Sequence, residues 1–217
     1  MGFTAAVSHE LRTPLARLLA LIDGASLPGA DPAAALRQAR AEVELMDELI
    51  DDVLFLSELE TGREVVSLGT TEAAPLIREI VSELAESAER AGVTVELAIE
   101  NETLELPIRA RMLRVVLENL LLNAIRYAGD GATAEIELSR DGDSCVFAVR
   151  DDGPGVSAAD LPRLFERFYR ADRARATRGS GLGLAIVKHV VEAAGGRVEA
   201  RGAPSAGLEI RATFPAA

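Results

Sequence analysis

The chain has 217 residues, enough for one large domain or two small ones. Its formal net charge of −12 argues against nucleic acid as a partner, because phosphate backbones are bound by basic surfaces. Hydrophobic residues make up 48% and aromatic residues 4%, so we expect an aliphatic core. The single cysteine, Cys145, excludes an internal disulfide and fits a reducing compartment; it lies in an apolar run, so we expect it to be buried.

The sequence carries no signal for membrane insertion or export. It has no run of 18 or more apolar residues, and Met1 is not followed by the basic region of a signal peptide. A conspicuous histidine motif comes almost at once after the start. We therefore expect the whole protein to have further sequence upstream.

The first 60 residues predict two helices joined by a turn. Apolar residues recur at helical spacing over 3–23, and glycine and proline mark a turn at 24–29. Asp31 and Pro32 are typical of a helix start, with an N-cap acceptor followed by proline at the first helical position. The second helix has a heptad seam, formed by Leu36, Ala39, Val43, Met46, Ile50, Val53 and Ser57.

A second apolar stripe runs beside this seam, at Leu45, Leu49, Leu56 and Leu59. Two stripes on one helix need two neighbours, and a single hairpin supplies only one. We therefore expect the other neighbour to be a second copy of the chain, which gives a dimeric four-helix bundle. The alternative is a monomeric hairpin packed on the following domain.

A second domain is expected at 72–217, after a hinge at 61–71 that carries a short apolar run at Val65 and Val66. Helical periodicity covers 71–91, 111–128 and 184–194. Strand-like patterns cover 93–100, 104–108, 133–139, 145–150, 197–201 and 208–214. Helices combined with mostly antiparallel strands predict an α+β fold, here a two-layer α/β sandwich.

The motif His-Glu-Leu-Arg-Thr-Pro-Leu begins at His9. In a helix Thr13 shares a face with His9, while Pro14 has no N–H for the Glu10 carbonyl, so we expect the helix to bend or loosen there. An oriented imidazole beside such an irregularity suggests chemistry on the histidine; for the segment alone, a solvated histidine is the alternative. A zinc peptidase is excluded, because it needs a second histidine four residues on and the only other one is His189.

Two later segments indicate a ligand site. Polar side chains share one face of an otherwise apolar helix, and so need partners or a ligand: Asn119, Asn123, Arg126 and Tyr127. Asparagine oxygens suit Mg²⁺, which also keeps waters and uses phosphate oxygens. Asp151-Asp152-Gly153-Pro154-Gly155 follows a strand and would let backbone approach a flat ligand, although such sequences also simply make turns.

The third segment, Gly179-Ser180-Gly181-Leu182-Gly183-Leu184, opens a helix whose N–H groups could bind phosphate. It is not a Walker A loop, since no Lys-Ser/Thr follows, nor a dinucleotide fingerprint, since the third glycine comes one residue early and no strand leads in. The stretch before it is expected to form a mobile basic lid, with Arg163, Arg167, Arg170, Arg173, Arg175 and Arg178.

In order and spacing these motifs resemble those of bacterial two-component sensor histidine kinases: the H box at 9–15, the N box at 119–127, the G1 box at 151–155, the F box at 164–170 and the G2 box at 179–184. The resemblance implies a dimerisation and phosphotransfer hairpin followed by a GHKL-type ATP-binding domain. It implies Mg-ATP-dependent phosphorylation of the histidine, transfer to an aspartate of a response-regulator receiver domain, and the reverse phosphatase activity. It also implies that this part is cytoplasmic and contacts no membrane, while the full-length protein is anchored in the bacterial inner membrane.

The resemblance also implies roles for the H box. His9 is the phosphoacceptor, and Glu10 holds its Nδ1–H so that Nε2 is the nucleophile. Thr13 orients water for dephosphorylation of the regulator. Arg170, from the F box, stabilises the transferring phosphoryl group.

The remaining boxes are implied to hold the nucleotide. Asn123 is the Mg²⁺ ligand, Arg126 meets phosphate, Tyr127 packs on adenine and Asp151 accepts from the adenine amino group. The triphosphate lies along Gly181 and Gly183. Further contacts are expected from Asn119, Gly153, Gly155, Gly179, Ser180, Leu182 and Leu184.

One position separates related families. Gyrase-type and mismatch-repair ATPases place a catalytic glutamate four residues before the metal-binding asparagine, where this chain has Asn119. An amide cannot act as a general base, so slow hydrolysis and transfer to His9 are expected. This residue speaks against a GHKL ATPase that drives conformational change. The complete H box speaks against an anti-sigma-type serine kinase, and the intact nucleotide motifs against a non-catalytic signalling scaffold.

Overall fold

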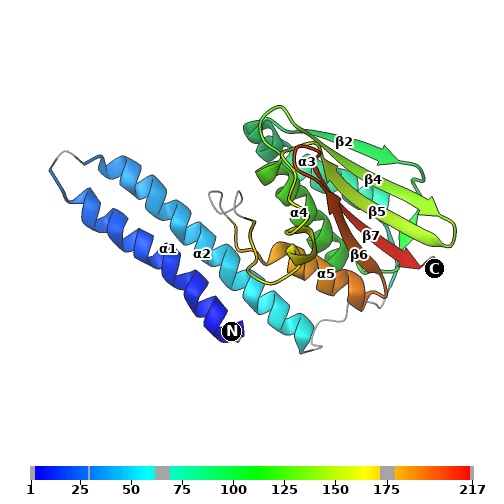
Figure 1. Ribbon diagram of the computed structural model, residues 1–217, viewed down its shortest axis with the longest axis horizontal. Helices are drawn as coiled ribbons and strands as arrows, with labels where there is room; N and C mark the ends of the chain where they lie inside the picture. The colour runs from blue at the N-terminus through cyan, green and yellow to red at the C-terminus, as the bar shows by residue number, and fades with distance from the viewer. Residues whose placement is uncertain (1–2, 29, 62–68, 172–178, 216–217) are drawn as a thin grey trace.

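The computed structural model describes residues 3–28, 30–61, 69–171 and 179–215. A helical hairpin lies beside a two-layer domain in which helices cover a sheet (Figure 1). The hairpin consists of α1 (Phe3–Ala25) and α2 (Pro32–Glu60). No helix in the described ranges is long and apolar enough to cross a bilayer.

Local sequence explains where the hairpin helices begin. Asp31 is the N-cap of α2, and its carboxylate accepts hydrogen bonds from the backbone N–H groups of Ala33 and Ala34 at 3.0 and 3.1 Å. This contact satisfies two of the donors that a helix start leaves without partners. The predicted helix start is therefore confirmed. Helix α1 continues unbroken through Pro14.

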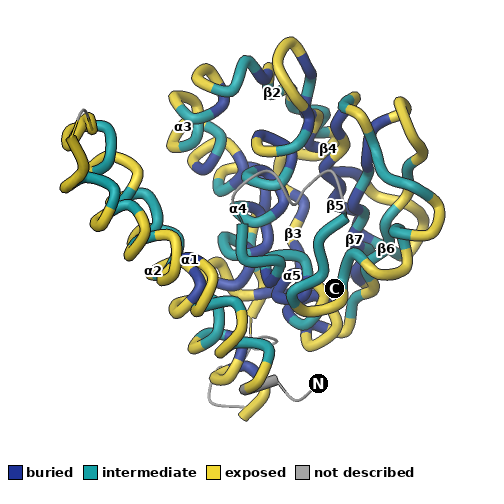
Figure 2. Tube along the Cα trace, turned by 60° about the vertical axis from the view of Figure 1, so that its left-hand side comes forward, coloured by how far each residue is buried: buried dark blue, intermediate teal, exposed yellow. Residues whose placement is uncertain are grey.

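The two apolar stripes of α2 differ in how far they are buried. Leu49, Leu56 and Leu59 of the second stripe are buried, and the latter two belong to the same core cluster as the second domain. The second domain is therefore a neighbour of this stripe. Along the first stripe Leu36 remains 70% exposed and Val43 50%. Figure 2 shows that most of the hairpin is coloured as exposed or intermediate.

The second domain is built on a five-stranded sheet with the order β2-β4-β5-β7-β6. Only β2 and β4 pair in parallel; the other neighbours are antiparallel. The strands are β2 (Thr94–Ile99), β4 (Thr133–Asp141), β5 (Ser144–Asp151), β6 (Arg197–Gly202) and β7 (Leu208–Pro215). The predicted α+β fold is confirmed.

Three helices pack on one face of this sheet (Figure 1): α3 (Ala73–Ala91), α4 (Ala110–Tyr127) and α5 (Gly183–Ala193). A 3₁₀ turn, η1 (Leu161–Arg163), precedes the F box. The core between the layers is mainly aliphatic, as predicted, and Cys145 is buried at 2% exposure. The two fully buried phenylalanines, Phe147 and Phe214, lie on the adjacent strands β5 and β7. Phe147 pairs with Ala212, and Phe214 pairs with Cys145.

Two predicted elements differ from the structure. Residues 71–72 were expected to begin a helix, but they form β1 (Thr71–Glu72), which pairs with β3 (Glu105–Leu106). The Thr71 hydroxyl donates to the carbonyl of Ile108 at 2.6 Å, which fixes this extended start. The strand predicted at 104–108 accordingly shrinks to two residues. Most of the predicted hinge, with Val65 and Val66, lies outside the described residues.

Candidate active site

A cavity of about 730 Å³ opens between α2, α4, α5 and the loops of the second domain. This is within the size range of small-molecule and cofactor sites. All three ligand-site segments reach it. The predicted residues that line it are Asn119, Asn123, Arg126, Tyr127, Asp151, Gly155, Arg170, Gly179, Ser180, Gly181, Gly183 and Leu184.

Two predicted contact residues lie outside the lining of the cavity. Leu182 has no exposed surface and belongs to the hydrophobic core. Gly153 packs against the end of α4, where a Cβ would lie 2.5 Å from the Cα atom of Ala128. Both residues hold the loops in place rather than line the cavity.

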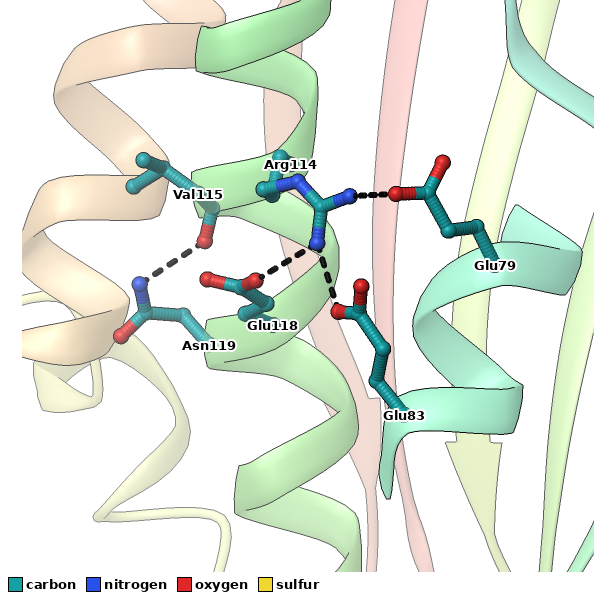
Figure 3. Close-up of polar contacts among 6 residues, drawn as sticks. All are labelled: Glu79, Glu83, Arg114, Val115, Glu118 and Asn119. Atoms are coloured by element: carbon teal, nitrogen blue, oxygen red, sulfur yellow. Dashed lines mark hydrogen bonds and ion pairs between the residues drawn. The ribbon is translucent and has the colours of Figure 1, made fainter. Parts of the chain in front are cut away.

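The polar face of α4 begins at Asn119. Its Nδ2 donates to the carbonyl of Val115 at 2.8 Å (Figure 3), which fixes the direction of the amide oxygen. That oxygen faces the start of α5, where a Cβ on Gly183 would lie 2.4 Å from it. The absence of a side chain at this glycine therefore lets α5 approach the asparagine closely.

An ion-pair cluster holds α3 against α4 (Figure 3). Arg114 contacts Glu83 at 2.7 Å and Glu118 at 3.2 Å, and also pairs with Glu79. The hydrogen bonds that the Arg114 guanidinium donates to Glu83 and then to Glu118 raise its pKa. The cluster keeps the Glu118 carboxylate, at the rim of the cavity, engaged with an arginine of its own helix.

Asp151 ends strand β5 and is only 6% exposed. Burial raises the pKa of its carboxyl, and backbone N–H donors from Gly153 and Leu208 oppose this in part. The bond from Gly153 is 3.0 Å long. Next to it, the Asp152 carboxylate accepts from the Thr133 N–H at 2.7 Å and fixes the loop to the sheet. A buried carboxylate held this way is suited to accept a hydrogen bond from a flat polar ligand.

The glycine-rich loop before α5 is tied to the F box. Gly181 has a φ of +70°, a left-handed conformation that favours glycine, and its carbonyl accepts from the Phe168 N–H at 2.9 Å. The Ser180 hydroxyl accepts from the Leu182 N–H at 3.2 Å. These contacts set the loop directly at the N-terminus of α5, where backbone N–H groups favour anions.

The described part of the predicted lid is anchored around Tyr169. Its hydroxyl donates to Asp160, which also accepts from the Ser157 hydroxyl at 2.8 Å. These two donors lower the pKa of Asp160. The Arg163 guanidinium lies 4.1 Å from the centre of the tyrosine ring. The anchor precedes Arg170 at the cavity; the predicted arginines at 173, 175 and 178 lie outside the described residues.

Helix α2 also contributes to the cavity, which could not be predicted from the sequence. Three carboxylates of this helix line the cavity: Glu48, Asp51 and Asp52. Acidic residues three and four positions apart are typical of a solvated helix face, so no local signal distinguishes them. Only the packing of α2 against the second domain brings them to the site.

His9 lies on α1, with its side chain 70% exposed. Its Nδ1 is 3.3 Å from a carboxylate oxygen of Glu10, as expected for a carboxylate that orients the imidazole. The Thr13 hydroxyl donates to the His9 carbonyl at 3.5 Å. Thus the nucleotide-type residues converge on the cavity, whereas the described lining does not include the histidine.

Comparison with known families matches these two parts separately. The model of the His Kinase A (phospho-acceptor) domain matches residues 2–62. The model of the histidine kinase-, DNA gyrase B-, and HSP90-like ATPases matches residues 108–217. The chain belongs to the sensor histidine kinase family.

Sensor histidine kinases of known sequence resemble the chain throughout. It is 33% identical to the sensor protein QseC of Escherichia coli K12, over 98% of this chain and 47% of QseC. It is 34% identical to the sensor protein kinase PmrB of Pseudomonas aeruginosa, over 98% of this chain and 45% of PmrB. The chain thus spans about half the length of the curated relatives it matches.

Solved histidine kinase structures share the fold. The Acinetobacter baumannii histidine kinase AdeS matches with a TM-score of 0.77 at 22% identity, over 95% of this chain and 97% of AdeS. The histidine kinase ThkA, solved in complex with the response regulator protein TrrA, matches with a TM-score of 0.80 at 22% identity, over 99% of this chain and 61% of that one. Full-length ShkA in complex with AMPPNP matches with a TM-score of 0.71 at 28% identity, over 98% of this chain and 46% of that one.

Proposed function

We propose that the chain is the catalytic core of a protein-histidine kinase, which transfers the γ-phosphoryl group of ATP to His9 and then to an aspartate of a response regulator. The observation that carries this proposal is the convergence of the N, G1 and G2 box residues on one cavity, in a chain that also holds a carboxylate-oriented histidine. We assign phosphotransfer to residues 1–60, a hinge to 61–71 and ATP binding to 72–217.

ATP fits the cavity by its chemistry. The adenine amino group would donate to the buried carboxylate of Asp151, with Tyr127 packed on the ring. The triphosphate would lie at the glycine-rich loop and Arg126, which line the cavity and could offer backbone N–H groups and a guanidinium to it.

Mg²⁺ suits the same cavity through Asn123. The described residues contain no cluster of three or more His, Cys, Asp or Glu side chains that could hold a metal by itself. An amide oxygen plus phosphate oxygens and water is the arrangement that Mg²⁺ accepts in nucleotide sites. When bound there, the ion would neutralise charge on the phosphates.

The residues of the chain then share the transfer chemistry. Glu10 accepts from Nδ1–H of His9, which leaves the Nε2 lone pair to attack the γ-phosphorus while the bond to the ADP oxygen breaks. Arg170, at the cavity, stabilises charge on the transferring group. For the reverse phosphatase activity, Thr13 orients a water toward the regulator's phosphoaspartate.

We infer two partners. The ThkA–TrrA complex supports a response-regulator receiver domain as phosphoryl acceptor. A homodimeric four-helix bundle would cover the large hydrophobic side chains that the hairpin exposes, namely Leu15, Leu19, Ile22, Leu27, Leu36, Val43, Ile50 and Leu54. The whole protein would be anchored in the inner membrane, with this part in the cytoplasm.

The experiment that tests the kinase is autophosphorylation with γ-labelled ATP and Mg²⁺. The parent chain is compared with His9→Gln and with His189→Gln, a control at the only other histidine. Label that requires His9, is lost in acid and survives alkali is phosphohistidine. Label that persists in His9→Gln would overturn the assignment and favour a serine kinase, while phosphate release without label would favour an ATPase.

A further inference from the structure

Glu118 is the only acidic residue of α4, and it lines the cavity on the same helix as Asn123, the proposed Mg²⁺ ligand. Its neighbour Asn119 also lines the cavity, but an amide cannot accept a proton from water, whereas a carboxylate can. A carboxylate beside a triphosphate is therefore a candidate general base for ATP hydrolysis. In that reaction the water oxygen attacks the γ-phosphorus, a proton of the water passes to the carboxylate, and the bond to the ADP oxygen breaks.

Arg114 holds this carboxylate. Its Nη1 donates to Glu118 at 3.2 Å and to Glu83 at 2.7 Å, and its Nη2 donates to Glu79. These four residues form the Arg114 cluster. Each of the two helices contributes a pair of residues four positions apart, which lie on one face of that helix. The contact is thus built into the spacing of α3 and α4.

The Arg114 cluster draws the carboxylate toward α3. In Figure 3 Asn119 and the two glutamates of α3 lie on different sides of α4. Arg114 is the least exposed of the four side chains in the cluster, so its guanidinium is the centre on which the three carboxylates meet. A charge-assisted hydrogen bond therefore keeps Glu118 on the α3 side, and its side chain is not free to turn further into the cavity.

We propose that Arg114 determines the phosphoryl acceptor: by restraining the Glu118 carboxylate it keeps water from being activated in the cavity, so that the γ-phosphoryl group is kept for His9. This inference rests on the proposed function of the cavity. Arg114 acts through Glu118 and is therefore a positioning residue. In the simpler alternative the cluster only fastens α3 to α4, and then Arg114 has no connection with ATP hydrolysis.

The size of the effect follows from the chemistry of a released carboxylate. A well-placed general base accelerates a reaction by roughly 10²–10⁴-fold. Because a released Glu118 would reach into the cavity for only part of the time, we expect Arg114→Met to raise the rate of ATP hydrolysis by about tenfold or more. Methionine keeps a long side chain but offers no hydrogen-bond donor. The gain should disappear in Arg114→Met/Glu118→Gln, since an amide cannot accept the proton.

The test measures the phosphate that the full chain releases from ATP in the presence of Mg²⁺. Every protein compared carries His9→Gln, so that phosphate released by way of phosphohistidine is not counted. Glu83→Gln is the matched control, because it removes one bond between α3 and α4 but leaves Arg114 to hold Glu118. We expect faster hydrolysis in Arg114→Met alone, and the rate of the His9→Gln chain in the control and in the double variant.

A second variant and a binding measurement keep the outcome decisive. Arg114→Lys retains a cation but lacks the planar fork that joins three carboxylates, so it should give a smaller rise if the methionine variant does not fold. Titration with the fluorescent analogue mant-ATP shows which variants bind nucleotide.

An unchanged rate in folded variants at Arg114 overturns the inference and leaves the kinase proposal intact. So does a rise that survives Glu118→Gln or that appears equally in Glu83→Gln, because either result means that looser packing alone is responsible. A parent chain that neither binds mant-ATP nor labels His9 overturns the proposed function itself.

Discussion

The most direct test of how the site is held together is Gly153→Ala. Gly153 lies in the G1 box, two residues after the buried Asp151, and donates its N–H to that carboxylate at 3.0 Å. A Cβ here would lie 2.5 Å from the Cα and 2.6 Å from the carbonyl oxygen of Ala128. Both are backbone atoms at the end of α4, so no side-chain rotation can relieve the contact.

The magnitude follows from these distances. Carbon atoms pack at roughly 3.5–4.0 Å, so the loop has to move by about 1 Å. Overpacking of this kind costs about 1–3 kcal/mol, which lowers Tm by roughly 2–12 °C in a chain of this size. The same shift lengthens the bond between Gly153 and Asp151, and a displacement of this order in a binding residue lowers nucleotide affinity by about tenfold or more.

Thermal denaturation followed by circular dichroism measures the first effect, and mant-ATP titration the second. Gly24→Ala is the matched control, because an added Cβ meets nothing within 4 Å in helix α1. That change should leave nucleotide binding as it is and stabilise the helix by about 0.5–1 kcal/mol. If Gly153→Ala keeps both the Tm and the affinity of the parent, the packing argument is refuted.

Three further outcomes are expected. Burial raises the pKa of Asp151 above its ordinary 3.8, so the native state binds more protons than the unfolded state, and stability falls as pH rises through the folded pKa. In urea denaturation, Asp151→Asn should therefore be more stable than the parent at pH 7, and the difference should vanish near pH 4. Equal stabilities at pH 7 would contradict this reasoning. Arg114→Gln should lower Tm because three glutamates lose their common partner. Added salt at 1 M should raise the Tm of this variant, whereas it should lower the Tm of the parent by screening its ion pairs. Leu120→Ala, at 1% exposure, should cost about 2–5 kcal/mol in urea denaturation, and a loss under 1 kcal/mol would show that the core relaxes there.

Features set by neighbouring residues could be predicted from the sequence. The start of α2 depends only on Asp31 and the residue after it, and the structure has it there. The polar face of α4 follows from helical spacing alone, so Asn119 and Asn123 reach the same cavity as expected. The short spacing within each box likewise fixes the loops that carry Asp151 and the glycines.

Features that depend on residues distant in the chain could not be predicted from the sequence. Thr71 continues a helical pattern, but pairing with Leu106 far along the chain makes it a strand. The apolar pattern around Leu56 predicts that this residue is buried but does not identify its partner. In the structure the second domain, rather than another copy of the chain, covers it. Asp52 has the composition of a solvated helix face, and only the docking of two domains makes it part of the site.

The charged edges of the sheet affect how copies of this kinase can lie beside one another. The last strand in the order, β6, bears alternating charges in which Glu199 pairs with Arg197 at 2.7 Å and Arg201 at 3.2 Å. The opposite edge, β2, exposes Thr94 and Glu96. Charged edges discourage strand addition from another molecule. Copies of this domain that lie side by side, as in the proposed dimer, can therefore remain separate without their sheets joining into aggregates.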